Sequence, residues 1–177
     1  VAAHAPFALV VTDVPCSGSG AWRRQPEAKW RLNRDRLSQL LETQRGCPYR
    51  CGYCYYNKSH EGLSFADATH LLQGVQWAID RHIKELYLLD PSLNAHPGLE
   101  DLLIKISRIN KNRQLKIISE IRAEAIDEKL ADLLAAAGFS WFEIGLQSTN
   151  PRALKIMNRP TRIAQFAQGA KRLKQRG

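Results

Sequence analysis

The sequence predicts an α/β fold in which parallel strands alternate with helices. Apolar strand-like runs alternate with amphipathic helix-like segments. After the second strand they recur at intervals of roughly 26–30 residues, as right-handed βαβ units do. The strands contain apolar runs, which suit strands of a parallel sheet that are buried on both faces. Polar residues gather directly after the strands, where ligands bind in folds of this class.

Four strands are expected, each from a short apolar run. They are SQLLETQ (38–44), ELYLLD (85–90), LKIISEI (115–121) and SWFEIGL (140–146). The first run leads directly into a loop that contains three cysteines. The other three end beside polar side chains, so the sequence predicts a polar site at the carboxyl edge of the sheet.

Helices are expected between and after these strands. Ser64 is expected to cap the first helix, whose apolar stripe is Leu71, Leu72, Val75 and Ile79. The others are residues 97–109, 127–138, 150–157 and about 161–175. Gly138 is expected at the C-terminal cap of its helix. Asn150 and Pro151 are expected to begin the next helix as N-cap and first helical residue.

Two layouts fit this order of elements, namely an open doubly wound sheet or part of a (βα) barrel of the TIM type. The chain stops after a helix and has no further strand to close a barrel. We therefore expect a partial barrel that is truncated after about four to five βα units. Such a sheet leaves an exposed edge strand.

Residues 1–36 are expected to be a lead-in or linker, and residues 37–177 to be the core domain. FALVVT (7–12) could form a short strand, and DVPCSGSG (13–20) is rich in turn residues. The sequence starts without a methionine, so we expect it to be a piece of a longer protein.

The composition predicts a globular, cytoplasmic protein. The chain has 177 residues, of which 44% are hydrophobic, and this excludes a disordered protein. No apolar run approaches the ~20 residues of a membrane span, and no secretory signal opens the chain. Three closely spaced cysteines and one isolated cysteine are a poor disulfide framework, which favours a reducing compartment.

The net charge of +9 leaves nucleic acid open as a partner. Basic residues concentrate in residues 23–36 and 171–176. The first run lies in the expected linker, where it could contact a neighbouring domain or an RNA. The second lies on an expected helix, and we interpret it as a solvated face. Nucleic acid is therefore a possible partner but not the favoured one.

Three of the four cysteines lie in RGCPYRCGYCYY, as Cys47, Cys51 and Cys54 with the spacing C-x3-C-x2-C. Thiolates select zinc, copper(I) and iron–sulfur clusters. A structural zinc site needs four ligands, and Cys16 or His60 would have to be the fourth. In a cubane 4Fe–4S cluster, three cysteines hold three irons and leave one iron open to an exogenous ligand. The compact loop after a strand favours the cluster, with zinc as the alternative.

Several segments resemble the core of radical S-adenosylmethionine (SAM) enzymes. They are CPYRCGYC, LLDPSLN, SEIRAEAID and FEIGLQSTNPRALKIMNR. The resemblance covers about residues 38–177, and it is greatest to the radical SAM proteins that carry an N-terminal cobalamin-binding domain. Similar RGCPYRC and GLQS segments occur in tRNA methylthiotransferases and coproporphyrinogen dehydrogenases. The resemblance implies an enzyme with a partial barrel of the radical SAM type.

This resemblance also implies cofactors and partners. Cys47, Cys51 and Cys54 would hold a 4Fe–4S cluster, and SAM would bind its open iron through amino and carboxylate groups. The reduced cluster would cleave SAM to methionine and a 5′-deoxyadenosyl radical, which abstracts hydrogen from a substrate. The substrate would be an unknown small molecule or peptide, and flavodoxin or ferredoxin would supply the electron. The cofactor carries this chemistry, so we assign no catalytic side chain.

Six residues at the strand ends are expected to contact SAM by the same resemblance. They are Tyr53, Asp90, Glu120, Arg122, Gln147 and Ser148. Tyr53 would pack near the adenine. Asp90 would accept from the amino group, although the family's Gly-Gly-Glu motif is replaced here by Leu88-Leu89-Asp90-Pro91.

The remaining contacts have structural alternatives. Glu120 would accept from the ribose hydroxyls and Arg122 would fork the SAM carboxylate, unless the two form an internal ion pair. Glu143 could join the same network. Gln147 and Ser148 would contact the ribose or carboxylate side, with loop capping as their alternative.

The chain has no cobalamin signature of its own. The motif D-x-H-x-x-G is matched only by Asp80-Arg81-His82, with Glu85 where the glycine should be. Cobalamin is therefore expected only through a domain that this chain lacks, and TDVPCSGSGAW is similar to the linker that follows such a domain. Two alternatives to a radical SAM core of this type stay open: a tRNA-modifying methylthiotransferase-like enzyme, and a zinc-binding module without catalysis.

Overall fold

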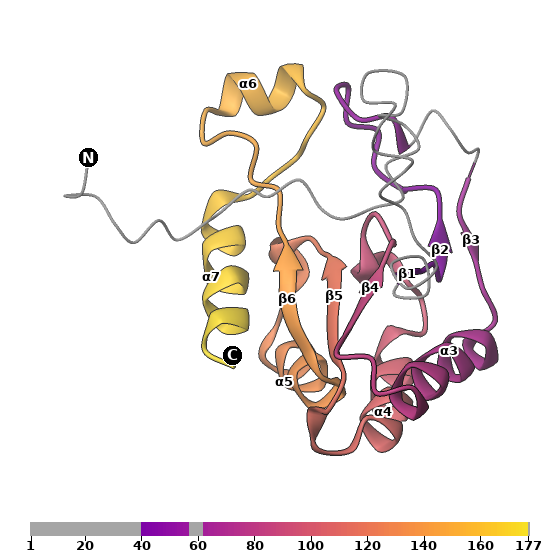
Figure 1. The fold of residues 1–177 in the computed structure, drawn as a ribbon. Helices are drawn as coiled ribbons and strands as arrows, with labels where there is room; N and C mark the ends of the chain where they lie inside the picture. The colour runs from indigo at the N-terminus through magenta and orange to yellow at the C-terminus, as the bar shows by residue number, and fades with distance from the viewer. Residues whose placement is uncertain (1–39, 57–61, 177) are drawn as a thin grey trace, which may run out of the picture. The chain divides into compact units, whose positions relative to one another are not determined.

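The computed structural model describes residues 40–56 and 62–176 of the chain (Figure 1). They belong to one compact unit that spans residues 38–177. The expected strand at 7–12 lies outside the described residues. The division of the chain at residue 36 stays a prediction.

The main sheet has four parallel strands in the order β1–β4–β5–β6. The strands are β1 (Leu40–Leu41), β4 (Glu85–Leu88), β5 (Lys116–Glu120) and β6 (Phe139–Glu143). Their spatial order follows the chain without a reversal. A doubly wound sheet needs a point where the order reverses, whereas a barrel does not. The expected partial barrel is therefore confirmed over the expected doubly wound alternative.

Five α-helices accompany the described part of the sheet. They are α3 (Ala68–Asp80), α4 (Leu99–Ile109), α5 (Glu128–Ala137), α6 (Pro151–Ile156) and α7 (Ile163–Lys174). Helix α4 packs against α3 and α5, and α5 packs against α7. Short 3-10 turns follow the strands or helices as η4 (Leu93–Ala95), η5 (Lys111–Arg113) and η6 (Ala123–Ala125). In Figure 1 the strands point upward, and α6 lies above their carboxyl ends.

The two faces of the sheet differ in burial. Leu86 and Ile117 belong to the hydrophobic core together with buried residues of α3, α4 and α5. Ile118 and Glu120 alternate with Ile117 along β5, so they face the other side, and both are only partly buried. The expectation that the strands are buried on both faces therefore holds for β4, whose inward-facing Tyr87 is also buried, but not for the inner face of β5. The second face corresponds to the inside of the partial barrel.

The start of the first helix was predicted wrongly. Ser64 does not cap it, because Ser64 belongs to β3 (Ser64–Phe65), which pairs antiparallel with β2 (Gln44–Arg45). The N-cap of α3 is Asp67, whose carboxylate accepts from the Thr69 amide at 3.0 Å. The expected strand 38–44 is likewise divided into β1 and β2. A two-residue ladder is too short to leave a periodic pattern in the sequence.

The other helix ends agree with the sequence. Helices α4, α5, α6 and α7 begin and end within two residues of their expected bounds. Asn150 caps α6 by accepting from the Arg152 amide at 2.9 Å, and Pro151 is the first helical residue. Gly138 caps α5 with a φ of 95°. None of the helices in the described ranges is long and apolar enough to cross a membrane.

Gly138 is expected to tolerate no side chain. A Cβ at this position would overlap the side-chain amide of Asn110 and would lie 2.8 Å from the Leu115 carbonyl oxygen. The Asn110 amide is buried and donates to the carbonyls of Leu115 (2.7 Å) and Ala137 (2.9 Å). Gly138→Ala should lower the free energy of unfolding by about 2–4 kcal/mol, measured by urea denaturation.

Gly62→Ala is the matched control for that substitution. Gly62 also has a positive φ, of 79°, but nothing lies within 4 Å of its Cβ position. Only the conformational cost of about 1 kcal/mol is expected there. Equal losses at the two glycines would contradict the steric part of this explanation.

Candidate functional site

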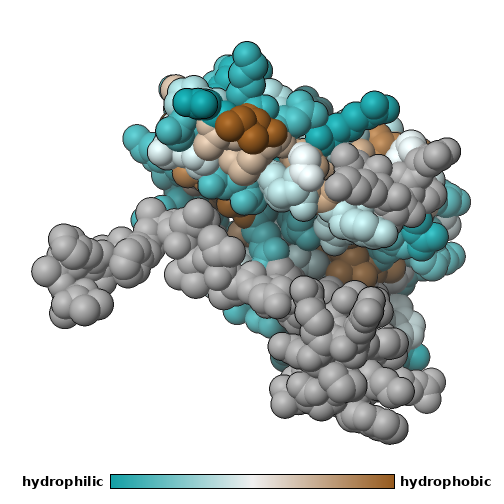
Figure 2. Space-filling model, turned by 90° about the horizontal axis from the view of Figure 1, so that it is seen from above, coloured by the Kyte–Doolittle hydropathy of each residue, from teal (hydrophilic) through white to brown (hydrophobic). Residues whose placement is uncertain are grey.

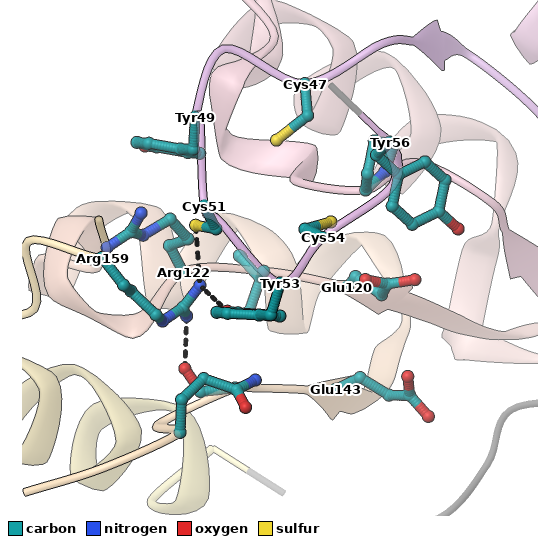
Figure 3. Close-up of a pocket in the computed structure, with 14 residues that line it drawn as sticks. Cys47, Tyr49, Cys51, Tyr53, Cys54, Tyr56, Glu120, Arg122, Glu143 and Arg159 are labelled. Atoms are coloured by element: carbon teal, nitrogen blue, oxygen red, sulfur yellow. Dashed lines mark hydrogen bonds between the residues drawn. The ribbon is translucent and has the colours of Figure 1, made fainter. Parts of the chain in front are cut away.

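The cysteine loop follows β2 and lies at the carboxyl end of the sheet (Figures 1 and 3). Cys47, Cys51 and Cys54 all carry free thiols, and Cys51 is buried. The Cys54 amide donates to the Cys51 carbonyl at 3.1 Å, which makes a tight turn between them. Burial raises the pKa of the Cys47 thiol. The local sequence therefore brings three thiols into one short loop above the strands.

The thiols line a cavity of about 150 Å³ together with side chains from the strand ends (Figure 3). Most of the residues expected at the site are brought together here, namely Cys47, Cys51, Cys54, Tyr53, Glu120, Arg122, Gln147 and Glu143. The parallel register of β5 and β6 pairs Glu120 directly with Glu143. Gln147 has a φ of 68°, which is uncommon for a residue with a side chain and is often found at functional sites.

Two of the expected residues do not line this cavity. Asp90 is fully buried, and its carboxylate accepts from the backbone amides of Thr43 (2.7 Å) and Gln44 (2.9 Å) and from the Thr43 hydroxyl. It therefore fixes the chain between β1 and β2. Ser148 accepts from the Asn150 amide at 3.0 Å, which is the loop-capping arrangement. Their expected contacts to SAM stay predictions.

The Arg122 side chain is buried, and only part of its hydrogen-bonding capacity is used. One guanidinium nitrogen donates to Glu124 at 2.9 Å, and the guanidinium carbon lies 4.0 Å from the centre of the Tyr49 ring. Its Nη1 is buried and has no hydrogen-bond partner among the described residues. The ion-pair alternative for Arg122 thus involves Glu124 and not Glu120. A buried cationic donor with an unused N–H group suits an anionic ligand.

Glu120 has an unusual environment for a carboxyl group. Burial, together with the nearby carboxylates of Glu143 and Asp90, raises its pKa from 4.5 to about 7. A carboxyl group with a pKa near neutrality can donate or accept a hydrogen bond, according to its protonation.

This shift predicts a pH-dependent stability. Between about pH 4.5 and 7 the unfolded chain loses the Glu120 proton while the folded chain keeps it. The folded state therefore loses stability as the pH rises through this window, by on the order of 1–3 kcal/mol. Glu120→Gln stays neutral, so its free energy of unfolding should rise relative to that of the wild type from pH 4.5 to pH 8. Glu85→Gln, at the exposed start of β4, is the control. Parallel pH profiles for Glu120→Gln and the wild type would refute this.

Tyr49 and Arg159 also line the cavity, although the sequence predicted no role for their side chains. The Nη1 of Arg159 lies 3.1 Å from the Tyr53 hydroxyl and 3.8 Å from the Cys51 sulfur, and its Nη2 donates to the Gly145 carbonyl (Figure 3). The Nε of Arg159 is buried without a partner among the described residues. One signal was available in the sequence: residues 144–177 contain no Asp or Glu, so Arg159 has no acidic partner nearby along the chain.

The three thiols at the cavity are ligands of the kind that binds an iron–sulfur cluster. Among residues 40–56 and 62–176, no group of three or more His, Cys, Asp or Glu side chains is arranged to hold a metal ion. A cubane cluster does not require its cysteines to converge on one ion, because each binds a different iron. Cys16 and His60, the expected fourth ligands of a zinc site, lie outside the described residues.

Two of the four basic residues in the run 171–176 are engaged in ion pairs. Arg172 pairs with Glu128 at 2.9 Å, and Arg176 pairs with Glu128 and Asp132 at 2.6 Å each. These pairs connect α7 to α5. The two lysines of this run are exposed, as a solvated helix face requires. Its two arginines are half-buried and form ion pairs with α5. The run 23–36 lies outside the described residues.

A comparison with family models shows to which family the chain belongs. Residues 41–177 match the family described as the radical SAM superfamily. The chain belongs to the radical SAM superfamily. The resemblance expected from CPYRCGYC and the strand-end motifs is therefore confirmed, as is the expectation that the chain comes from a family of enzymes.

Relatives in the radical SAM superfamily include two kinds of transferase. The chain is 30% identical over 145 residues to tryptophan 2-C-methyltransferase of Streptomyces laurentii, which covers 74% of this chain and 24% of the relative. It is 25% identical over 158 residues to tRNA-2-methylthio-N(6)-dimethylallyladenosine synthase of Acidithiobacillus ferrooxidans, covering 81% of this chain and 34% of the relative. The chain thus spans about a quarter to a third of these relatives.

Solved radical SAM structures share the fold. The methyltransferase TsrM from Kitasatospora setae, solved with cobalamin and a [4Fe-4S] cluster, superposes with a TM-score of 0.71 at 20% identity, covering 78% of this chain and 29% of TsrM. The cobalamin-dependent enzyme OxsB superposes with a TM-score of 0.64 at 21% identity, covering 78% of this chain and 22% of OxsB. At these identities the two superpositions show that the fold is shared.

Proposed function

We propose that this chain is the cluster- and SAM-binding part of a radical SAM enzyme. The observation that carries the proposal is the cavity in which three free thiols lie opposite polar side chains from successive strand ends. Cys47, Cys51 and Cys54 would hold a 4Fe–4S cluster. When bound, the cluster supplies one electron that cleaves SAM to methionine and a 5′-deoxyadenosyl radical.

The chain's own residues would bind and orient SAM. The unused Nη1 of Arg122 is a donor for the SAM carboxylate, held rigidly by Glu124 and by the Tyr49 ring. Glu120 faces the inside of the partial barrel, where it can accept from ribose hydroxyls. Tyr53 and Gln147 line the same cavity and supply an aromatic ring and an amide. The buried Ile121 and the half-buried Tyr49 line this cavity and would limit access of water to the reacting atoms.

Anaerobic reconstitution with iron and sulfide, followed by reduction with dithionite in the presence of SAM, tests this proposal. We expect 5′-deoxyadenosine and methionine in equal amounts, measured by liquid chromatography. A chain that carries a reduced cluster and yet forms no 5′-deoxyadenosine above the protein-free control would contradict the proposal.

The whole protein's reaction is a further proposal. We infer transfer to a small-molecule substrate with the help of an upstream cobalamin domain, supported by the likeness to the tryptophan methyltransferase and to TsrM. A one-electron carrier such as flavodoxin or ferredoxin would reduce the cluster.

The second candidate is methylthiolation of tRNA. The relative from Acidithiobacillus ferrooxidans and the net charge of +9 favour it. Two of the basic residues in 171–176 are already paired with α5, which reduces the charge available to phosphates. Binding to tRNA with a steep dependence on salt would support this candidate, and no binding at low salt would exclude it.

A further inference from the structure

The cysteine loop is tied to the end of α6, which is more than a hundred positions away in the sequence. The Gly52 amide donates to the Met157 carbonyl at 2.8 Å. The side-chain amide of Asn158 donates to the Arg50 carbonyl at 2.7 Å. These two bonds attach the residues on either side of Cys51. They form a clasp, which we define as residues 157–158 and their bonds to residues 50 and 52.

The segment that carries the clasp is itself well fixed. Helix α6 is capped by Asn150, and its Leu154 side chain is buried. Backbone bonds from Asn158 to Lys155 (3.1 Å) and from Arg159 to Leu154 (2.9 Å) close the last turn. Asn158 has a φ of 50°, a left-handed conformation that asparagine tolerates better than most residues. Position 158 therefore needs both a particular backbone conformation and a side-chain donor.

We propose that Asn158 is a positioning residue that holds Cys51 in the conformation required for cluster binding. A short loop with Gly52 and few backbone bonds of its own would otherwise have to be ordered when the cluster binds, and that ordering costs free energy. The clasp orders the loop in advance from both sides of Cys51. The part of this inference that concerns the cluster rests on the proposed function.

Two substitutions at position 158 distinguish the contribution of the side-chain N–H donor from that of the left-handed backbone conformation. Asn158→Asp keeps the size and the tolerance of the left-handed region but removes the donor. Asn158→Gly keeps the conformation and removes the whole side chain. The matched control is Asn112→Asp, because Asn112 is exposed, has a φ of 59°, and lies in η5 at the other end of the sheet.

The first measurement is amide hydrogen exchange in the cluster-free chain. The Gly52 amide should exchange about fivefold faster in both Asn158 variants, as expected for the loss of one neutral hydrogen bond. Amides of β5 serve as the internal reference for intact folding. The second measurement is the rate of iron loss from the reconstituted chain to a chelator, which should also rise about fivefold. Asn112→Asp should match the wild type in both.

The outcomes distinguish this inference from the proposed function. Failure of the wild type to take up a cluster would overturn the proposed function and the cluster role of Asn158, while hydrogen exchange would still decide whether Asn158 orders the loop. If the Gly52 amide exchanged at the wild-type rate in both Asn158 variants, the proposal that Asn158 orders the cysteine loop would be overturned. Faster exchange with unchanged iron loss would overturn the role of the clasp in cluster binding.

Discussion

Alanine at Cys47, Cys51 or Cys54 should abolish stable cluster binding by this chain. Each thiolate is expected to bind its own iron, so none of the three can replace another. Loss of residues that merely support metal ligands costs 10–100-fold in affinity in other proteins, so loss of a ligand should cost about 100-fold or more. Iron and sulfide per chain, and the absorbance of the reconstituted protein, measure this directly.

Cys16→Ala is the matched control for the three cysteine variants. It removes the one thiol outside the loop, and a cluster held by the triplet alone should be unaffected. If Cys16→Ala lost its metal as completely as Cys51→Ala, Cys16 would be a fourth ligand. A four-ligand zinc site that includes Cys16 would then be favoured over the iron–sulfur cluster.

Gly169→Ala should destabilise the protein even though alanine favours helices. Gly169 is buried in α7, and a Cβ there would overlap the carbonyl oxygen of Ala123 in η6. That oxygen belongs to the backbone and cannot rotate away. The gain in helix propensity is about 1 kcal/mol. The forced separation of α7 from η6 should outweigh it and leave a net loss of about 1–3 kcal/mol.

The same substitution should weaken SAM binding, because η6 directly follows Arg122 and contains its partner Glu124. Gly74→Ala is the control, since Gly74 also lies in a helix but its Cβ would meet only the ends of the flexible Leu41 side chain. Urea denaturation and calorimetric titration with SAM measure the two effects. A Gly169→Ala protein as stable as Gly74→Ala would contradict the close contact between α7 and η6.

The alternation of elements was predictable because it depends on local patterns. The amphipathic stripe of α4 is encoded within a single helix, and the N-cap Asn150 and the C-cap Gly138 are each encoded within one turn. The short β2–β3 ladder was missed because two residues carry no periodicity.

The site was predictable only where a motif or a strand end marked it. The cysteines and Glu120 belong to this group. The side-chain contacts of Asp90 depend on Thr43 and Gln44, which lie 47 and 46 positions earlier, so its structural role could not be seen from its position after a strand. The approach of Arg159 to Cys51 spans 108 positions and likewise has no local signature.

Electron paramagnetic resonance of the reduced, reconstituted chain with and without SAM tests the central claim most directly. The claim predicts about four irons and four sulfides per chain. It also predicts a cluster signal whose g values shift when SAM is added, because SAM binds the iron that the three cysteines leave open. Stoichiometric zinc without sulfide, or a cluster signal unchanged by saturating SAM, would contradict it.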